Sequence, residues 1–301
     1  MKQENLEGRR DSLSLRLDDI YRMTSFIYHD ANLGRSREAT LLHFVEVCGM
    51  LTLSDRKKKR DRVDVPGALC KALGWYFPLL AKMGVESVER LIFTKYPKVC
   101  PYCRLSPHVE QQCKLVKGTE GVLSHERVRE LMDANWESRP VGLNDWQRMF
   151  GDIYPRSLNS TGFSTIALLE ELRELAEAVR VFDRYPHYFY GEAADVFSYL
   201  MGLANEYALR CSEREETFDY EREFLARYPG LCIACGARVC ICPTVPQATV
   251  GRMAKEMPIT VSYITDADRF DAAGHEIAQQ VLDSVGRVPA SPSTYRMIVA
   301  T

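Results

Sequence analysis

The chain contains an internal repeat, and this repeat restricts it to folds built from two similar halves. Residues 19–23 (DIYRM) recur 126 positions later as residues 145–149 (DWQRM). Residues 96–103 (YPKVCPYC) recur 132 positions later as residues 228–235 (YPGLCIAC). Agreement that keeps its order at two similar offsets indicates a duplication. We therefore expect two copies that pack against each other as a pseudo-dimer within one chain.

The spacing of apolar residues predicts a mainly α-helical chain. Proline-glycine and tyrosine-glycine pairs mark the starts of corresponding helices in the two halves, at Pro66-Gly67 and Tyr190-Gly191. We expect helices at 12–30, 37–54, 66–83 and 86–95 in the first half, at 143–153, 163–183, 190–210 and 213–227 in the second half, and at 124–135 between them.

Four regions follow from the repeat and from changes in residue pattern. Residues 1–113 form the first helical repeat, residues 114–142 a linker, and residues 143–243 the second helical repeat. Residues 244–301 differ, because 258–264 and 297–300 have the β-branched, apolar character of strands around a helix-like stretch. We expect this last region to be a small α/β segment or the beginning of a further domain.

The cysteines fall mostly into two groups with the spacing of metal ligands. Each group ends one of the repeats, and each offers a closed set of four ligands, which is typical of a structural zinc ion. The remaining thiols are expected to pack as small apolar residues. The first zinc set is Cys100, Cys103, His108 and Cys113, the second is Cys232, Cys235, Cys240 and Cys242, and the remaining thiols are Cys48, Cys70 and Cys211.

Two helical segments of the second half carry carboxylates beside their apolar faces. Glu171 and Glu174 border the face made by Leu168, Leu172 and Val179, and the next helix carries Glu192 and Asp195 on the side of Val196, Tyr199 and Leu203. Unpaired buried carboxylates cost several kcal/mol each. A divalent cation would compensate for them, and oxygen ligands alone suit Mg²⁺ or Mn²⁺. The alternative is that these acids lie on solvated helix faces, where such patterns are frequent.

Composition narrows the classes of function. The 301 residues have a formal net charge of −2 and are 46% hydrophobic, which indicates an ordinary folded interior and no general attraction to nucleic acid. No apolar run reaches the ~20 residues of a membrane helix, and the first ten residues are charged, unlike a signal peptide. We expect a soluble, cytoplasmic protein with no membrane partner. The basic run 56–60 is interpreted as a solvated loop between acidic residues.

The acids of the second half give the chain a resemblance to a known family. Glu170-Glu171-Leu172-Arg173-Glu174, then Glu192-Ala193-Ala194-Asp195 after a gap, resembles the signature of the MazG-like, all-α nucleoside triphosphate pyrophosphohydrolases. The resemblance covers about residues 143–210. It implies Mg²⁺-dependent hydrolysis of a nucleoside triphosphate to the monophosphate and pyrophosphate, and helical bundles that pair as dimers. It further implies that Glu171, Glu174, Glu192 and Asp195 hold the metal, with Glu171 or Glu174 as the base.

The chain departs from this family pattern at two places. Gly202 stands where an asparagine is common, so that Asn205 is the expected nucleotide contact in this helix. Arg210 is the expected phosphate-binding cation, while Arg214 and Arg222 are open to the same role. Structural salt bridges are the alternative for all three arginines.

The first repeat has lost most of the acids. Glu46 corresponds to Glu171, but Gly49, Gly67 and Cys70 stand in the places of Glu174, Glu192 and Asp195. We therefore expect the first repeat to be a degenerate copy that serves as a scaffold for the second.

Two hypotheses about function follow, from different classes. The first is a metal-dependent pyrophosphohydrolase that acts on a free nucleotide and uses Mg²⁺ or Mn²⁺ together with structural zinc. The alternative is a zinc-stabilised sensor or adaptor that binds a nucleotide or a protein without catalysis. Near-zero net charge argues against a nucleic-acid partner, and the pseudo-dimer leaves further homo-oligomerisation open.

Overall fold

The structure of the protein is a computed structural model. The part of the chain that it describes is helical and contains no β-strand, so the mainly α-helical fold expected from the sequence is confirmed to that extent. The expected basic loop at 56–60 and the two expected strands of the C-terminal region lie outside it. The described residues are 15–53, 63–117, 125–156, 163–242, 276 and 279–280.

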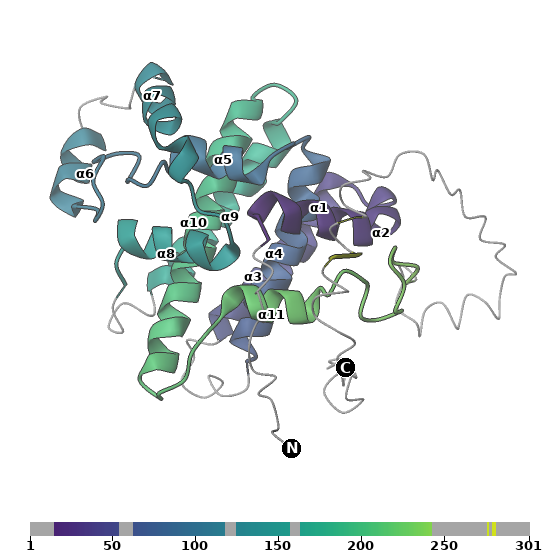
Figure 1. The fold of residues 1–301 in the computed structure, drawn as a ribbon. Helices are drawn as coiled ribbons and strands as arrows, with labels where there is room; N and C mark the ends of the chain where they lie inside the picture. The colour runs from purple at the N-terminus through teal and green to yellow at the C-terminus, as the bar shows by residue number, and fades with distance from the viewer. Residues whose placement is uncertain are drawn as a thin grey trace, which may run out of the picture.

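Eleven α-helices and one 3₁₀ helix make up these residues (Figure 1). None of these helices is long and apolar enough to cross a membrane. The helices are α1 (Leu17–Ile27), α2 (His29–Leu33), α3 (Arg37–Leu53), α4 (Val65–Lys82), α5 (Val88–Lys95), α6 (Glu110–Lys117), α7 (His125–Asn135), the 3₁₀ helix η2 (Trp136–Ser138), α8 (Leu143–Ile153), α9 (Phe163–Val181), α10 (Pro186–Ser212) and α11 (Tyr220–Arg227).

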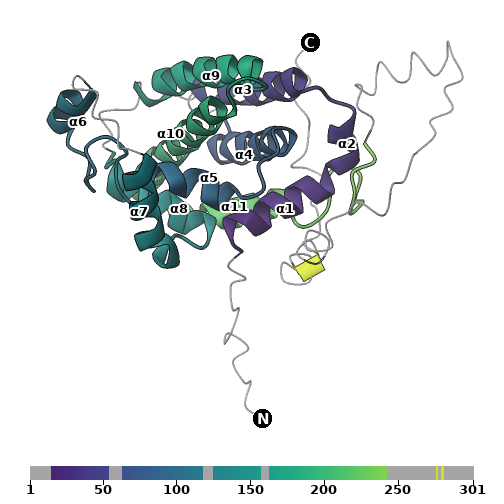
Figure 2. The same cartoon turned by 90° about the horizontal axis from the view of Figure 1, so that it is seen from above.

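The longer helices form three layers (Figure 2). Helices α3 and α9 lie on one side, α4 and α10 lie in the middle, and α1, α5, α8 and α11 lie on the other side. Large aromatic residues fill the space between the layers, among them Tyr76, Trp146 and Phe197, all fully buried. The hydroxyl of Tyr76 donates a hydrogen bond of 2.9 Å to the carbonyl oxygen of Ala193, which joins α4 to α10 across the middle layer.

Corresponding helices of the two halves begin in the same way. The carboxylates of Asp19 and Asp145 accept hydrogen bonds from the backbone N–H groups just before α1 and α8. The side chains of Ser87 and Asp219 accept from backbone N–H groups in the first turns of α5 and α11. These caps satisfy N–H groups that have no partner inside the helix. They therefore fix equal boundaries at the offsets of 126 and 132 seen in the sequence.

Several helix boundaries differ from the expected ones. Pro186 was expected in a loop but is the first residue of α10, where its missing N–H costs nothing. The expected helix at 213–227 is wrong in its first half: Glu215 has a positive φ of 60°, and α11 begins only after Asp219. The short helix α2 and helix α6 were not expected, and α6 crosses the boundary at 113/114 between the first region and the linker.

The end of each half packs against the other half. Helix α5 lies on α10, and α11 lies on α4. The backbone N–H of His108 donates to the carbonyl oxygen of Ile153 at 2.7 Å, and the equivalent N–H of Cys240 donates to Ile27 at 2.6 Å. The ring of Tyr96 meets Tyr154 edge-on, and the same contact recurs between Tyr28 and Tyr228. The two halves therefore exchange their terminal segments.

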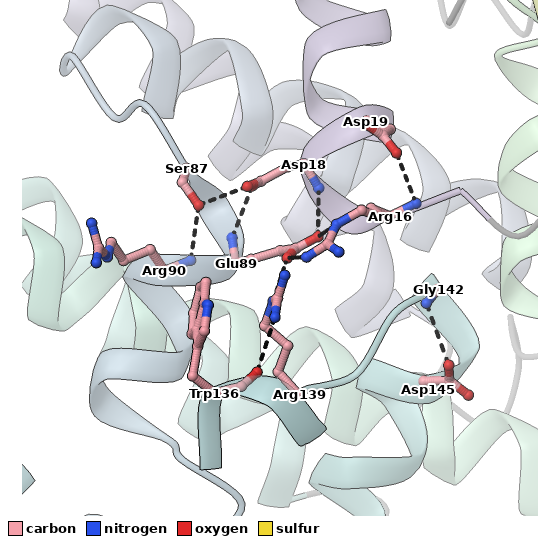
Figure 3. Close-up of polar contacts among 10 residues, drawn as sticks. All are labelled: Arg16, Asp18, Asp19, Ser87, Glu89, Arg90, Trp136, Arg139, Gly142 and Asp145. Atoms are coloured by element: carbon pink, nitrogen blue, oxygen red, sulfur yellow. Dashed lines mark hydrogen bonds and ion pairs between the residues drawn. The ribbon is translucent and has the colours of Figure 1, made fainter. Parts of the chain in front are cut away.

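A buried carboxylate fixes the beginning of α5 (Figure 3). Glu89 is 1% exposed and binds the guanidinium groups of Arg16, before α1, and Arg139, in the connection between the halves. Asp18 accepts hydrogen bonds from the hydroxyl of Ser87 and from the backbone N–H of Glu89. Three segments far apart in the sequence meet here, so the direction of α5 is strongly determined.

Candidate metal centres

Three of the four predicted acids meet between α9 and α10. One carboxylate oxygen from each of Glu171, Glu192 and Asp195 lies within 4.8 Å of the others, and we call these residues the acid group. Glu171 comes from α9, whereas Glu192 and Asp195 lie one turn apart on α10. The Oε2 atoms of Glu171 and Glu192 are buried and have no hydrogen-bond partner. Two orphaned, buried oxygens facing a third carboxylate are what an oxygen-ligated divalent ion would require.

The electrostatics of the acid group favour a bound cation. Burial, and next the negative charge of Asp195, raise the pKa of Glu171 to about 7. The same two causes raise the pKa of Glu192 to about 7. Both side chains therefore hold protons near neutral pH when no cation is bound. A cation can replace these protons, so these three carboxylates could hold a metal ion.

Asp195 differs from the other two acids because both of its oxygens have partners. Its Oδ2 is 2.5 Å from the ammonium Nζ of Lys95, and its Oδ1 accepts a hydrogen bond of 2.5 Å from the hydroxyl of Tyr96. Both partners come from the end of α5 and so from the first repeat. Sequence reasoning missed them, because nothing in the pattern of α5 indicates that it lies on α10.

A third first-repeat residue lies near the acid group. Tyr102 stands between Cys100 and Cys103 in the first cysteine group. Burial, and next the charges of Asp195, Glu171 and Glu192, raise the pKa of Tyr102 to about 12. The first repeat therefore supplies Lys95, Tyr96 and Tyr102 to the surroundings of the acid group.

Glu174, the fourth predicted acid, lies outside the acid group. Its side chain is 39% exposed and pairs with Arg173 at 2.6 Å. The carboxylate of Glu174 thus pairs with an exposed guanidinium and does not join the acid group. Its charge still contributes to the raised pKa of Glu171.

The predicted nucleotide contacts on α10 do not reach the acid group. Asn205 donates a hydrogen bond of 2.9 Å to the carbonyl oxygen of Gln147 and fastens α10 to α8. At 1.5 Å per residue, Asn205 lies about 15 Å beyond Asp195 along the helix, and Arg210 about 22 Å beyond it. Arg214 pairs with Glu216 at 3.1 Å. The expected contact residues are therefore separated from the acids by helix length.

The absence of a side chain at Gly202 has a structural explanation that the family pattern did not suggest. A Cβ atom at this position would lie 2.4 Å from Nη2 of Arg156. Arg156 donates to the hydroxyl of Ser164 at 3.0 Å and lies 3.7 Å from the buried carboxylate of Glu206. Glycine thus makes room for a guanidinium that joins the start of α9 to α10.

The first cysteine group has the geometry of a closed metal site. The Sγ atoms of Cys100 and Cys113 are 3.5 Å apart, and Nδ1 of His108 lies 3.2 Å from Cys113 and 3.7 Å from Cys103. Ligands at Zn–S distances of about 2.3 Å in a tetrahedron lie about 3.8 Å apart. These four side chains could therefore hold a metal such as zinc.

The second cysteine group has the same character. The Sγ atoms of Cys232 and Cys242 are 3.8 Å apart, and one sulfur from each of Cys232, Cys235, Cys240 and Cys242 lies within 4.8 Å of the others. All ten cysteines of the chain are free thiols. Cys48 and Cys70 are buried in the hydrophobic core, as the sequence predicted. Cys211 is also buried, but its Sγ accepts a hydrogen bond of 3.7 Å from Nη2 of Arg214.

The place that corresponds to the acid group in the first repeat is filled by side chains. A Cβ at Gly67 would lie 2.9 Å from Nη2 of Arg227, and one at Gly74 would lie 2.1 Å from the hydroxyl of Tyr228. Glu46, the acid that remains, is 60% exposed and pairs with His43 at 3.1 Å. The first repeat therefore offers no equivalent group of carboxylates among its described residues.

Comparison of the chain with protein families, with curated proteins and with solved structures found no match.

Proposed function

We propose that the protein is a metal-dependent nucleotide pyrophosphohydrolase that converts a nucleoside triphosphate to the monophosphate and pyrophosphate. The observation that carries the proposal is the acid group, with its two unpaired, buried oxygens on Glu171 and Glu192. Its acids lie on two adjacent helices, in the order of the MazG-like signature that the sequence resembles. A helix pair that only needed to pack would gain stability from apolar residues at these positions.

Glu171, Glu192 and Asp195 are the proposed ligands of Mg²⁺ or Mn²⁺, and Glu174 is a further ligand if it leaves Arg173. A divalent ion in such a site supplies Lewis acidity, which polarises phosphoryl oxygens and lowers the pKa of a bound water. Glu171 is the proposed base, and an oxygen of its carboxylate that is not used by the metal would accept a proton from the attacking water. Burial of the acid group keeps these charges in a medium where they interact strongly.

The proposal also includes a duplication of the helical repeat and structural zinc at the two cysteine groups. The duplication is supported by the equal lengths of α1 and α8 and of α5 and α11, by equivalent caps, and by reciprocal contacts between the halves. We assign structural zinc ions to both cysteine groups, because their ligands leave no position free for a substrate. The first repeat, residues 1–113, then serves the catalytic second repeat, residues 143–243, as an intramolecular partner.

Product analysis tests this function directly. The protein is incubated with ribo- and deoxyribonucleoside triphosphates and Mg²⁺ or Mn²⁺, and the monophosphate and pyrophosphate are measured. We expect turnover by the parent and a loss of at least about a hundredfold in Glu171→Gln, which removes a metal ligand and the base. The matched control is Glu46→Gln, the corresponding acid of the first repeat, which should keep near-parent turnover.

Two outcomes would contradict the proposal. Full activity in Glu171→Gln would place the reaction elsewhere in the molecule. A folded, metal-loaded parent that binds a nucleotide and releases no pyrophosphate would instead favour the sensor hypothesis.

A further inference from the structure

The positively charged side chain of Lys95 lies beside the acid group and would compete with a metal ion for Asp195. The ammonium of Lys95 lies 2.5 Å from Oδ2 of Asp195 and 3.2 Å from the carbonyl oxygen of Gly191, and its side chain is only 24% exposed. Asp195 is 14% exposed, and Tyr96 occupies its other oxygen. By contrast, Glu171 and Glu192 each keep a buried oxygen that has no partner.

Each oxygen of Asp195 keeps a second lone pair for a metal ion, but an ion bound there would lie close to the ammonium of Lys95 and would favour a rearrangement of one of these two donors. Tyr96 is rigidly placed, because its ring contacts both Phe150 and Tyr154. Lys95 has a flexible four-carbon stem, and the α5 helix that carries it is held separately by the buried Glu89. Repulsion between a divalent cation and the ammonium favours the same choice. Lys95 is the donor that moves.

We propose that Lys95 is a phosphate ligand supplied by the first repeat, which exchanges Asp195 for the triphosphate when the metal and nucleotide bind. This inference rests on the proposed function for the nature of the substrate. The displaced ammonium lies beside the metal site, where phosphate oxygens provide the strongest new acceptors. The first repeat, having lost its own acids, is retained because it delivers this charge.

Two arginines can be compared with Lys95, and neither is placed to supply the same charge to the phosphates. Arg173 is 65% exposed and is engaged by Glu174 and Glu177. Arg227, which corresponds to Lys95 in the second repeat, pairs with Asp64 at 2.8 Å, on the opposite side of the pseudo-dimer. Arg227 therefore provides a matched control, since it stands at the same helix position without an acid group beside it.

Two binding measurements on the full chain separate the exchange from a purely structural role. The first is Mn²⁺ affinity without nucleotide, followed by electron paramagnetic resonance. In Lys95→Met we expect about tenfold tighter Mn²⁺ binding, because a positive charge close to the metal is removed. The second is the affinity of Mn²⁺-loaded protein for the α,β-methylene analogues of the common nucleoside triphosphates. There we expect about tenfold weaker binding in Lys95→Met.

Three further variants complete the design. Lys95→Arg should restore most of the nucleotide affinity, because the charge is kept, and Arg227→Met should leave both affinities at the parent value. Lys95→Gln keeps a polar partner for Asp195, and it replaces Lys95→Met if the latter fails to fold. The analogues are not hydrolysed, so both measurements apply even to a protein that turns over no nucleotide.

The outcomes are distinct. Opposite changes in the two affinities support the exchange, and a parent without pyrophosphate release would then overturn only the proposed reaction. Unchanged nucleotide affinity in Lys95→Met and Lys95→Gln would overturn the assignment of Lys95 to the phosphates. Unchanged or weaker Mn²⁺ binding in those variants would overturn the competition at Asp195.

Discussion

At the scale of single residues, three carboxylates of the acid group have different partners. Asp195 is paired with Lys95 and accepts a hydrogen bond from Tyr96, whereas Glu171 and Glu192 each keep a buried oxygen with no hydrogen-bond partner among the described residues. Their pKa values of about 7 result from burial first and from Asp195 second. Without a cation, these two residues exchange protons with solvent in the range of pH where the protein is expected to work.

This titration predicts how pH changes the stability of the protein in Mg²⁺-free buffer. Glu171 and Glu192 have folded pKa values of about 7, above the ordinary 4.5, so the folded state binds more protons between these values. Their contribution is fully present below about pH 4.5 and is lost as the pH rises towards about 7. Urea denaturation between these limits should show a steeper fall in the free energy of unfolding for the parent than for Glu171→Gln.

The control for this measurement is Glu170→Gln, which changes an exposed neighbour in the same helix. Its pH dependence should match that of the parent. Equal slopes for the parent and Glu171→Gln would mean that Glu171 does not retain its proton in the folded protein.

At the scale of elements, helix α5 connects two buried polar clusters. Its first turn holds Glu89 between Arg16 and Arg139, and its last residue, Lys95, reaches Asp195. Trp136 lies under the guanidinium of Arg139, 4.1 Å from it to the ring centre. The position of Lys95 at the acid group thus depends on a contact at the other end of the same helix.

Removing the charge of Glu89 should destabilise the whole molecule. In Glu89→Gln, two guanidinium groups lose their carboxylate, and breaking a buried pair of this kind costs about 3–5 kcal/mol. Urea denaturation measures this loss. Glu86→Gln, an exposed glutamate just before α5, should change the free energy of unfolding by less than about 0.5 kcal/mol. A similarly small effect in Glu89→Gln would show that the two arginines find other partners.

The order of the helices was predictable from local signals in the sequence, but not all of their boundaries were. Repeated segments and apolar spacing gave nine helices in their correct order, and α8 with its correct boundaries. Cap signals were harder to weigh: Asp219 caps the beginning of α11, yet the charged run 213–216 suits a helix equally well. Boundaries set by one side chain in competition with propensity are not readable from periodicity.

Only the part of the candidate site that lies on two consecutive helices was predictable from the sequence. Glu171, Glu192 and Asp195 follow from helical spacing on two consecutive helices. Lys95, Tyr96 and Tyr102 do not, because their approach depends on the exchange of segments between the halves. Asn205 and Arg210 were chosen by family pattern; they lie about 15 Å and about 22 Å from Asp195 along α10, and their role as nucleotide contacts stays a prediction.

At the scale of the whole molecule, the two cysteine groups occupy equivalent positions with unequal surroundings. The first group carries Tyr102 towards the acid group, whereas the second has Ala234 at the corresponding position. Both have ligand sets that could hold zinc. The proposed duplication therefore provides an internal control for the role of each proposed zinc site.

We expect about two zinc ions per chain, measured by elemental analysis of protein purified without chelator. Cys100→Ser and Cys232→Ser should each lose about one ion. Nucleotide turnover should fall at least about tenfold in Cys100→Ser, because the wall beside the acid group loosens, and should change little in a folded Cys232→Ser. Absence of zinc from the parent would contradict the zinc assignment, and equal losses of turnover would contradict the unequal roles.

The reciprocal hydrogen bonds from His108 to Ile153 and from Cys240 to Ile27 also affect how the chain is made. Synthesis produces α5 well before α10, so at first α5 can pack only on earlier helices such as α1. Its contacts with α10 require the second half of the chain. We therefore expect the first half to reach its final packing only after α10 has been synthesised.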